Sequence, residues 1–185
     1  MTIAPLKIGF TPDEFTAYVK KLGRLEWPAK AVTIHNTYMP NLKMVDDYLA
    51  AKKWTPEQLI ENWWTMYRQK GWYSGPHIFV FRDKIYVATP LTLRGTHSPS
   101  LNKDHFGIEL LGDYSKEILP DSIRSMGVHS AAVLLNKIGA HATMKTVKFH
   151  GDDPKTTHRG CPGKNVGTKA DWIAAIDAAQ KKLIF

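Results

Sequence analysis

Three side chains have the chemical types and the placement along the chain to hold a zinc ion together. His35 and His150 each come directly after a short run typical of a β-strand, and Cys161 follows in a loop rich in turn residues. Side chains at strand ends are held rigidly, and imidazole nitrogen and thiolate sulfur are preferred zinc ligands. Three protein ligands leave one position for the water of a catalytic site. We therefore predict a catalytic zinc site formed by His35, His150 and Cys161.

Spacing alone leaves a second interpretation of Cys161 open. It is the only cysteine, so an intramolecular disulfide is impossible, and a lone cysteine is commonly a small buried hydrophobic residue. It lies eleven residues after His150 and three after His158, which matches no zinc-finger pattern. The metal interpretation requires this loop to fold back onto the strand that precedes it.

Helices and strands alternate along the chain around these residues. Capping boxes with proline at the first helical position begin two helices, at Thr11–Glu14 and Thr55–Gln58. Two more helices are expected from about residue 120 to 138 and from 170 towards 184. Short apolar or β-branched runs predict five strands: Ala31 to Ile34, His77 to Phe81, Lys84 to Val87, Phe106 to Leu111 and Thr146 to Phe149.

This alternation predicts an α/β fold in a single domain. One strand pair is joined by a plausible hairpin turn at residues 81–84, so the central β-sheet should be mixed, with α-helices on both faces. We expect residues 1–27 to form an N-terminal helical extension, 28–175 the catalytic domain, and 176–185 the end of the C-terminal helix.

Charge and hydropathy narrow the possible partners. The net charge of +8 favours an anionic partner, such as a nucleic acid, a lipid surface or an acidic wall polymer. We find no helix-turn-helix and no aromatic-basic stripe, so a nucleic acid is not expected. The chain shows neither a secretory signal pattern nor the ~18 consecutive apolar residues of a membrane span, so stable membrane insertion is not expected.

Four segments, in order along the chain, resemble the motifs of one enzyme family: Ile34–Thr37, Gly75–Val80, Gly107–Leu110 and His150–Gly163. Over roughly residues 28–175, the chain resembles the zinc-dependent N-acetylmuramoyl-L-alanine amidases of the phage-lysozyme and peptidoglycan-recognition-protein superfamily. The resemblance implies a sheet flanked by helices and hydrolysis of the amide bond between muramic acid and L-alanine. It also implies one zinc ion bound by two histidines and a cysteine or aspartate.

Two further residues receive catalytic roles from this resemblance. Strand alternation places Glu109 on the face opposite Ile108 and Leu110, and the family's Gly-Ile-Glu motif implies that Glu109 is the general base. An arbitrary strand glutamate would instead pair with a lysine or arginine. His158, eight residues after His150, is expected to donate a hydrogen bond to the oxyanion, although a solvated loop imidazole is the alternative.

Substrate-binding residues are expected on the loops around the site. Arg159 stands two residues before the cysteine, where the family usually carries a basic residue. Trp72 and Tyr73 lie beside turn residues and are expected to form the cleft wall, and His97 is expected to line the cleft. In contrast, Trp63 and Trp64 follow helical spacing and are expected in the core.

One motif position departs from the family. Some members carry a tyrosine just before the histidine of the second strand, where this chain has Pro76 followed by His77. Proline cannot donate a hydrogen bond, so any catalytic tyrosine must come from elsewhere, with Tyr73 the nearest candidate. His77 is then expected to have a structural role or to support the site from its second shell.

The expected biological role is that of a phage or prophage endolysin. Such a protein is made in the cytoplasm without a signal peptide and acts as a monomer on peptidoglycan after release. A cytosolic muropeptide-recycling amidase is the alternative, but that branch typically has aspartate where this chain has Cys161. A non-catalytic peptidoglycan-recognition module, which would lack a metal ligand, is the other alternative.

Overall fold

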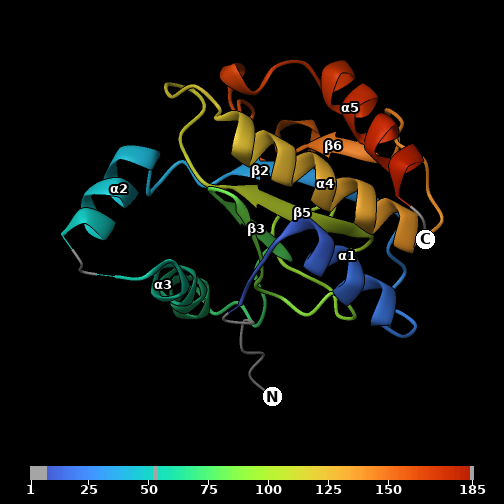
Figure 1. Ribbon diagram of the computed structural model, residues 1–185, viewed down its shortest axis with the longest axis horizontal. Coiled ribbons are helices and arrows are strands. Elements are labelled where there is room, and N and C mark those ends of the chain that lie inside the picture. The colour runs from blue at the N-terminus through green and yellow to red at the C-terminus, as the bar shows by residue number, and fades with distance from the viewer. Residues whose placement is uncertain (1–7, 52–53, 184–185) are drawn as a thin grey trace.

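A six-stranded mixed sheet forms the centre of the computed structural model, which describes residues 8–51 and 54–183 (Figure 1). The strands are β1 (Gly9–Phe10), β2 (Ala31–Asn36), β3 (Ile78–Phe81), β4 (Lys84–Val87), β5 (His105–Leu110) and β6 (Val147–Phe149). Their order is β1-β4-β3-β5-β2-β6. Strands β3, β5, β2 and β6 run parallel, whereas β4 pairs antiparallel with β3 and β1. The predicted mixed α/β sheet is confirmed.

The described part of the chain has five α-helices packed against the sheet: α1 (Pro12–Lys21), α2 (Leu42–Ala50), α3 (Pro56–Gln69), α4 (Asp121–Lys137) and α5 (Lys169–Lys182). The capping boxes predicted at Thr11 and Thr55 begin α1 and α3. Helix α2, with Asn41 as its N-cap, and the two-residue β1 were not predicted. The expected end of α5 at Ile184, like residues 1–7 of the N-terminal extension, lies outside the described residues.

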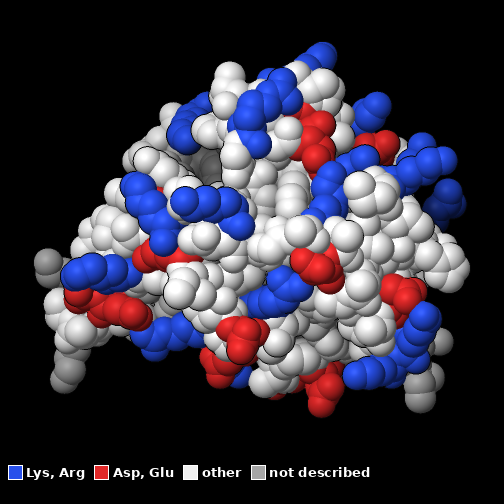
Figure 2. Space-filling view, turned by 90° about the horizontal axis from the view of Figure 1, so that it is seen from above, with Lys and Arg blue, Asp and Glu red and all other residues white. Residues whose placement is uncertain are grey.

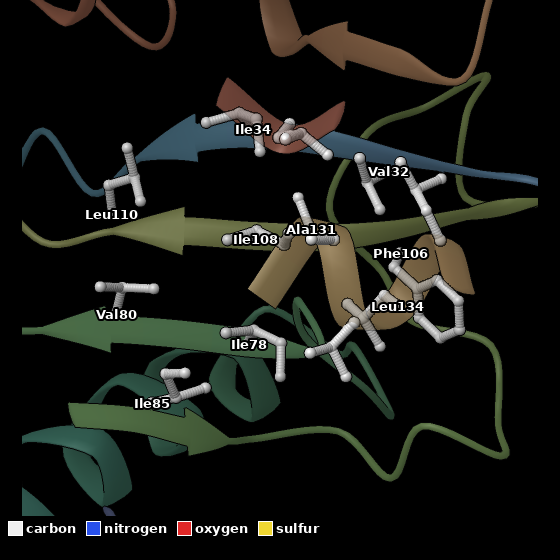
Figure 3. Packing of buried hydrophobic residues seen from close by; sticks show 14 of the residues in the cluster. Val32, Ile34, Ile78, Val80, Ile85, Phe106, Ile108, Leu110, Ala131 and Leu134 are labelled. Atoms are coloured by element: carbon white, nitrogen blue, oxygen red, sulfur yellow. The ribbon is translucent and has the colours of Figure 1, made fainter. Parts of the chain in front are cut away.

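The helices cover opposite faces of the sheet. On one face, alternate residues of β2, β5 and β3 pack against α4, as Ile34, Ile108 and Ile78 do near Ala131 and Leu134 (Figure 3). Helices α1 and α5 add their apolar residues to the same core. The other face packs against α2 and α3 in a smaller cluster of Val45, Leu59, Ile60, Trp63, Phe79, Phe81, Tyr86, Ala88 and Leu111. Helices on both faces therefore agree with the predicted fold.

The register of β2 and β5 decides which side chains meet on the α3 face. Strand β2 continues to Asn36, two residues beyond its expected end, because its pairing with β5 continues to Leu110. His35 therefore lies within the strand rather than after it, and it is directly opposite Glu109. Since neighbouring strand residues point to opposite faces, burying Ile34 and Ile108 in the main core turns His35 and Glu109 to the other side.

The expected burial of two tryptophans is confirmed. Trp63 and Trp64 of α3 are buried, as their helical spacing indicated. Within residues 8–51 and 54–183, none of the helices combines the length and the apolar character needed to cross a lipid bilayer.

Candidate active site

A cavity of about 510 Å³ opens where β2 and β5 end and the loop after β6 folds over them. Its lining residues come from five places in the chain: β2 and the following loop, the end of α3 and the residues after it, the loop around His97, β5 and the segment after it, and the loop from 150 to 163. These residues are His35, Asn36, Thr37, Tyr38, Met66, Tyr67, Lys70, Trp72, His97, Glu109, Asp113, Ser115, His150, Thr157, His158, Arg159, Gly160, Cys161 and Gly163. Ligand sites of open α/β sheets commonly lie at the carboxyl ends of the strands, as this one does.

The three predicted metal ligands lie together in this cavity. One ligand atom from each of His35, His150 and Cys161 lies within 4.8 Å of the other two. Ligands of a tetrahedral zinc ion are roughly 3.5 Å apart, given bond lengths of about 2.0–2.3 Å. The loop folds back as the metal interpretation required, because the Gly151 amide donates to the Cys161 carbonyl at 2.9 Å.

The two histidines present neutral rings, as zinc ligation requires. His35 is 2% exposed and His150 8% exposed. Burial lowers the pKa of His35 well below its usual value and lowers that of His150 to about 4. Each ring uses Nε2 in a hydrogen bond, His35 with His97 Nδ1 at 3.0 Å and His150 with Thr156 Oγ1 at 2.9 Å. Nδ1 is therefore the ring nitrogen left for a metal on both residues.

The third ligand, Cys161, is held as a thiol in the absence of a cation. Its Sγ donates to Asn36 Oδ1 at 3.2 Å, and burial together with the charge of Glu109 raises its pKa to about 12. A divalent ion displaces such a proton, because the metal binds the thiolate. The residues present thus fit a zinc ion, with two neutral imidazoles and a thiol that the ion itself would ionise.

Glu109 lies beside the metal ligands on the neighbouring strand. Its side chain is 8% exposed, and burial raises its pKa to about 8. Among the described residues, no lysine or arginine forms an ion pair with Glu109. The alternative of a structural ion pair is therefore not what the structure shows, and a carboxyl group with a raised pKa in a cavity is a candidate proton carrier.

The two basic residues of the metal loop differ in their contacts. The His158 ring lies 5.5 Å from the His150 ring and lines the cavity. The Arg159 guanidinium donates to the carbonyls of Asp153 and Pro154, each at 2.8 Å, so its charged end is held by its own loop. Their roles in oxyanion stabilisation and substrate binding remain predictions.

The expected substrate-binding residues divide into two groups. Trp72 lines the cavity, is 39% exposed and stacks on Tyr67 with ring centroids 5.4 Å apart. Tyr73 is 84% exposed, and the described residues that line the cavity do not include it. His97 lines the cavity as expected, and its ring also forms a hydrogen bond with His35, a predicted metal ligand.

Sequence reasoning missed Tyr67, which lines the cavity from the last turn of α3. The pKa of its hydroxyl is raised well above the usual value, first by burial and then by the charges of Glu109 and Cys161. Tyr67 follows Trp63 by four residues, so its helical spacing is that of a core residue and does not reveal that the hydroxyl reaches the cavity. This chain has Pro76 at the position where some family members carry a tyrosine. Tyr67 places a phenol hydroxyl at the site from a different element.

His77 has structural contacts on both ring nitrogens. Nδ1 accepts from the Gly107 amide at 3.1 Å, and Nε2 bonds to the Leu93 carbonyl at 3.0 Å. Its ring also stacks on Trp27, with centroids 5.1 Å apart. These contacts place it among the supports of β5, in agreement with the structural role expected for it.

Comparisons with known proteins identify solved structures of similar fold. No curated protein sequence matches the chain significantly. The solved endolysin N-acetylmuramoyl-L-alanine amidase LysCS from Clostridium intestinale is 25% identical, with a TM-score of 0.57, covering 75% of this chain and 78% of that one. The amidase LysC from the same organism is 24% identical (TM-score 0.62, 82% and 87% covered), and wild-type Drosophila PGRP-LB is 22% identical (TM-score 0.60, 80% and 82% covered).

A family model described as N-acetylmuramoyl-L-alanine amidase matches residues 26–164. This match contains the whole cavity, from His35 to Gly163. Strands β2 to β6 and the cluster of His35, His150, Cys161 and Glu109 lie inside it, whereas β1 precedes it. The chain therefore belongs to the N-acetylmuramoyl-L-alanine amidase family.

Proposed function

We propose that this amidase cleaves the bond between N-acetylmuramic acid and L-alanine with one zinc ion bound by His35, His150 and Cys161. The observation that supports this most directly is the convergence of these three ligand atoms beside the buried Glu109 in one cavity. When bound, zinc supplies Lewis-acid catalysis, polarising the scissile carbonyl and lowering the pKa of water to about 7. The protein residues then position the substrate and move protons.

Glu109 is proposed as the group that moves protons. A carboxylate beside the reacting centre can accept a proton from the attacking water and give it to the leaving amine, so that the proton count balances. Burial favours this exchange because it raises the proton affinity of Glu109 into the neutral range. Its position opposite His35 in the β2–β5 register keeps it beside the metal ligands.

Tyr67 is proposed to donate a hydrogen bond to the oxyanion, since burial and the nearby charges keep its hydroxyl protonated. We expect Tyr67→Phe to lower kcat by about 10²-fold, the lower end of the loss caused by removing one oxyanion donor. KM and zinc content should stay unchanged. Kinetics on purified sacculi check this, with Tyr48→Phe, a tyrosine outside the cavity, as the matched control. A wild-type kcat for Tyr67→Phe would remove the hydroxyl from the mechanism.

Trp72 is proposed to bind the sugar part of the substrate by stacking, since Tyr67 holds its ring at the cavity. Lys70, 5.5 Å from the same ring, adds positive charge there. We expect Trp72→Ala to raise KM by about 3- to 10-fold with little change in kcat, given 0.5–1.5 kcal/mol for an aromatic contact. Trp54→Ala, outside the cavity, is the control. An unchanged KM for Trp72→Ala would contradict the stacking role.

The surface charge supports a polymeric anionic substrate. The net charge is +8, and one face of the molecule is hollowed, with lysine and arginine side chains around the hollow (Figure 2). We infer that the protein acts as an endolysin on assembled wall rather than as a recycling enzyme. Hydrolysis of purified sacculi, compared with soluble anhydro-muropeptide, tests this inference. Activity confined to the soluble substrate would favour the recycling role.

The metal-dependent reaction itself is tested by metal analysis and rescue. Chelation should remove zinc and wall hydrolysis together, and added zinc should restore both. Digested wall should expose new amino termini on L-alanine, because the bond broken joins that amine to the muramic acid lactyl group. Full activity of the zinc-free protein would refute the proposal. The complete ligand set argues against a non-catalytic recognition module.

A further inference from the structure

His97 forms the middle of a chain of hydrogen bonds that ends at a metal ligand. Its Nε2 lies 2.9 Å from the His105 carbonyl oxygen, and its Nδ1 lies 3.0 Å from His35 Nε2. A carbonyl oxygen only accepts, so His97 Nε2 must carry the hydrogen. In a neutral ring the other nitrogen, Nδ1, is then an acceptor, and His35 Nε2 must donate to it.

This order of donors fixes the tautomer of His35. With its proton on Nε2, the His35 ring has its lone pair on Nδ1, the nitrogen left for a metal. The two rings meet edge to face, with centroids 5.0 Å apart and an angle of 86° between their planes. In that geometry, His97 constrains both the proton and the orientation of the His35 ring.

Gly107 of β5 provides the space that His97 occupies. A Cβ atom added to Gly107 would lie 2.5 Å from His97 Cγ, so any larger residue must displace the His97 ring. This contact gives a physical reason for the glycine in the Gly-Ile-Glu segment. The same strand thus carries Glu109 and, two residues earlier, the space for the ring that orients His35.

The loop that carries His97 is also bound to the metal loop. Asn102 Oδ1 accepts from the amides of His97 and Ser98, each at 2.7 Å. Completely buried Asp153 accepts from the Ser98 hydroxyl and, at 2.8 Å, from the Ser100 amide. Asp153 belongs to the loop of His150 and Cys161, so these contacts hold all three metal ligands in one connected frame.

We propose that His97 is a positioning residue that holds His35 in the Nε2-protonated tautomer and directs its Nδ1 to the metal site, with Gly107 making room for it. This role deepens the proposed zinc-dependent function and rests on it. His97 acts through His35, so its loss should weaken zinc binding. Loss of a second-sphere partner typically costs about 10- to 100-fold in metal affinity.

Two variants of nearly equal shape separate positioning from space filling. His97→Asn keeps an acceptor oxygen near the place of Nδ1, whereas His97→Leu has similar size and no acceptor. We expect His97→Leu to lower zinc affinity by about 10- to 100-fold, measured by chelator competition, and His97→Asn to recover most of that loss. Equal zinc affinity of the Leu variant and the wild type, or equal impairment of both variants, overturns the proposal.

Nitrogen NMR of the protein after removal of metal determines the tautomer of the His35 ring independently of zinc binding. In the wild type and in His97→Asn, the His35 ring should be protonated at Nε2. In His97→Leu, it should become a mixture of both tautomers. A wild-type ring protonated at Nδ1 overturns the positioning role, even in a protein that binds zinc. Conversely, a wild-type protein with the expected tautomer and no zinc binding refutes the metal-dependent function while the orienting contact stands.

Gly107→Ala tests the same role by displacing the His97 ring without removing it, which matters if His97→Leu folds poorly. We expect this variant to weaken zinc binding in the wild type but to add little in a His97→Gly background, where all three His97 atoms that the new Cβ would meet are absent. Gly23→Ala is the matched control, because a Cβ there meets nothing within 4 Å. Additive losses from Gly107→Ala and His97→Gly would overturn the proposed link between residues 107 and 97.

Discussion

The Cys161→Ser variant should lose wall hydrolysis almost completely, by at least about 10³-fold, while keeping its fold. A serine hydroxyl does not ionise at a zinc site as a thiol does, so the donor set falls to two imidazoles. Zinc affinity should fall by more than the roughly 100-fold caused by losing a second-sphere contact. Turnover on purified sacculi and chelator competition measure the two losses.

Thermal unfolding supplies the control for this variant. Added zinc should raise the melting temperature of the wild type, because a ligand that binds only the folded state stabilises it, and it should leave Cys161→Ser nearly unchanged. Without metal, the two proteins should melt at similar temperatures, since the exchanged side chains have similar size. Full wall hydrolysis by Cys161→Ser without bound zinc would show that the site is wrongly assigned.

The Glu109→Gln variant should lower kcat by about 10²- to 10⁴-fold, the range expected for loss of a general acid-base group. Glutamine keeps the shape of the side chain but can neither accept nor release the proton. Zinc affinity should change far less than in Cys161→Ser, because Glu109 is not among the three ligands. The separation of these two effects distinguishes a proton carrier from a metal ligand.

Glu109 should also govern the pH dependence of the wild type. A base acts in its ionised form, so kcat/KM should rise with pH through the pKa of Glu109, above the ordinary value of 4.5. Burial alone sets that pKa at about 8, and the charge of a bound zinc ion lowers it from there. If the residual activity of Glu109→Gln no longer rises with pH in this range, Glu109 is the group whose ionisation causes the rise. If the same rise persists in Glu109→Gln, another residue is responsible for it.

Because its pKa is raised, Glu109 should also make the stability of the folded protein depend on pH. The folded protein holds the Glu109 proton more tightly than the unfolded chain does, so Glu109 lowers the free energy of unfolding increasingly as pH rises from 4.5 to about 8. After removal of metal, Glu109→Gln should therefore melt at a higher temperature than the wild type at pH 8. The difference should vanish below pH 4.5. A buried carboxyl group that is needed for catalysis can thus lower the stability of the folded protein.

The elements that could be predicted are those whose signals are local. Capping boxes at Thr11 and Thr55 mark their helices because cap and helix contact each other within three residues. The alternation around Glu109 placed it opposite the core because the side-chain period of a strand is two. Helix α2 lacks a capping box, and the two-residue β1 exists only through its pairing with β4, so neither was found.

The cluster of proposed metal ligands was predictable from residue types and motif order, but its surroundings were not. Tyr67 lies 42 residues before Glu109 in sequence and reaches the same cavity only because α3 packs on that face of the sheet. Tyr73, next to Trp72 in sequence, is outside the cavity lining, since consecutive residues in a loop need not share a direction. The bond between His97 and His35 spans 62 residues.

By itself, the sequence determined the fold class, the helix starts, the three ligand types and the carboxyl group beside them. These depend on periodicity, caps and short motifs, which act over a few residues. Only the tertiary structure decided which tyrosine enters the site, which nitrogen of His35 is left for the proposed metal, and what space the glycine at residue 107 leaves. Each of these depends on the distance and direction between side chains of different elements, which the packing of helices and loops on the sheet sets.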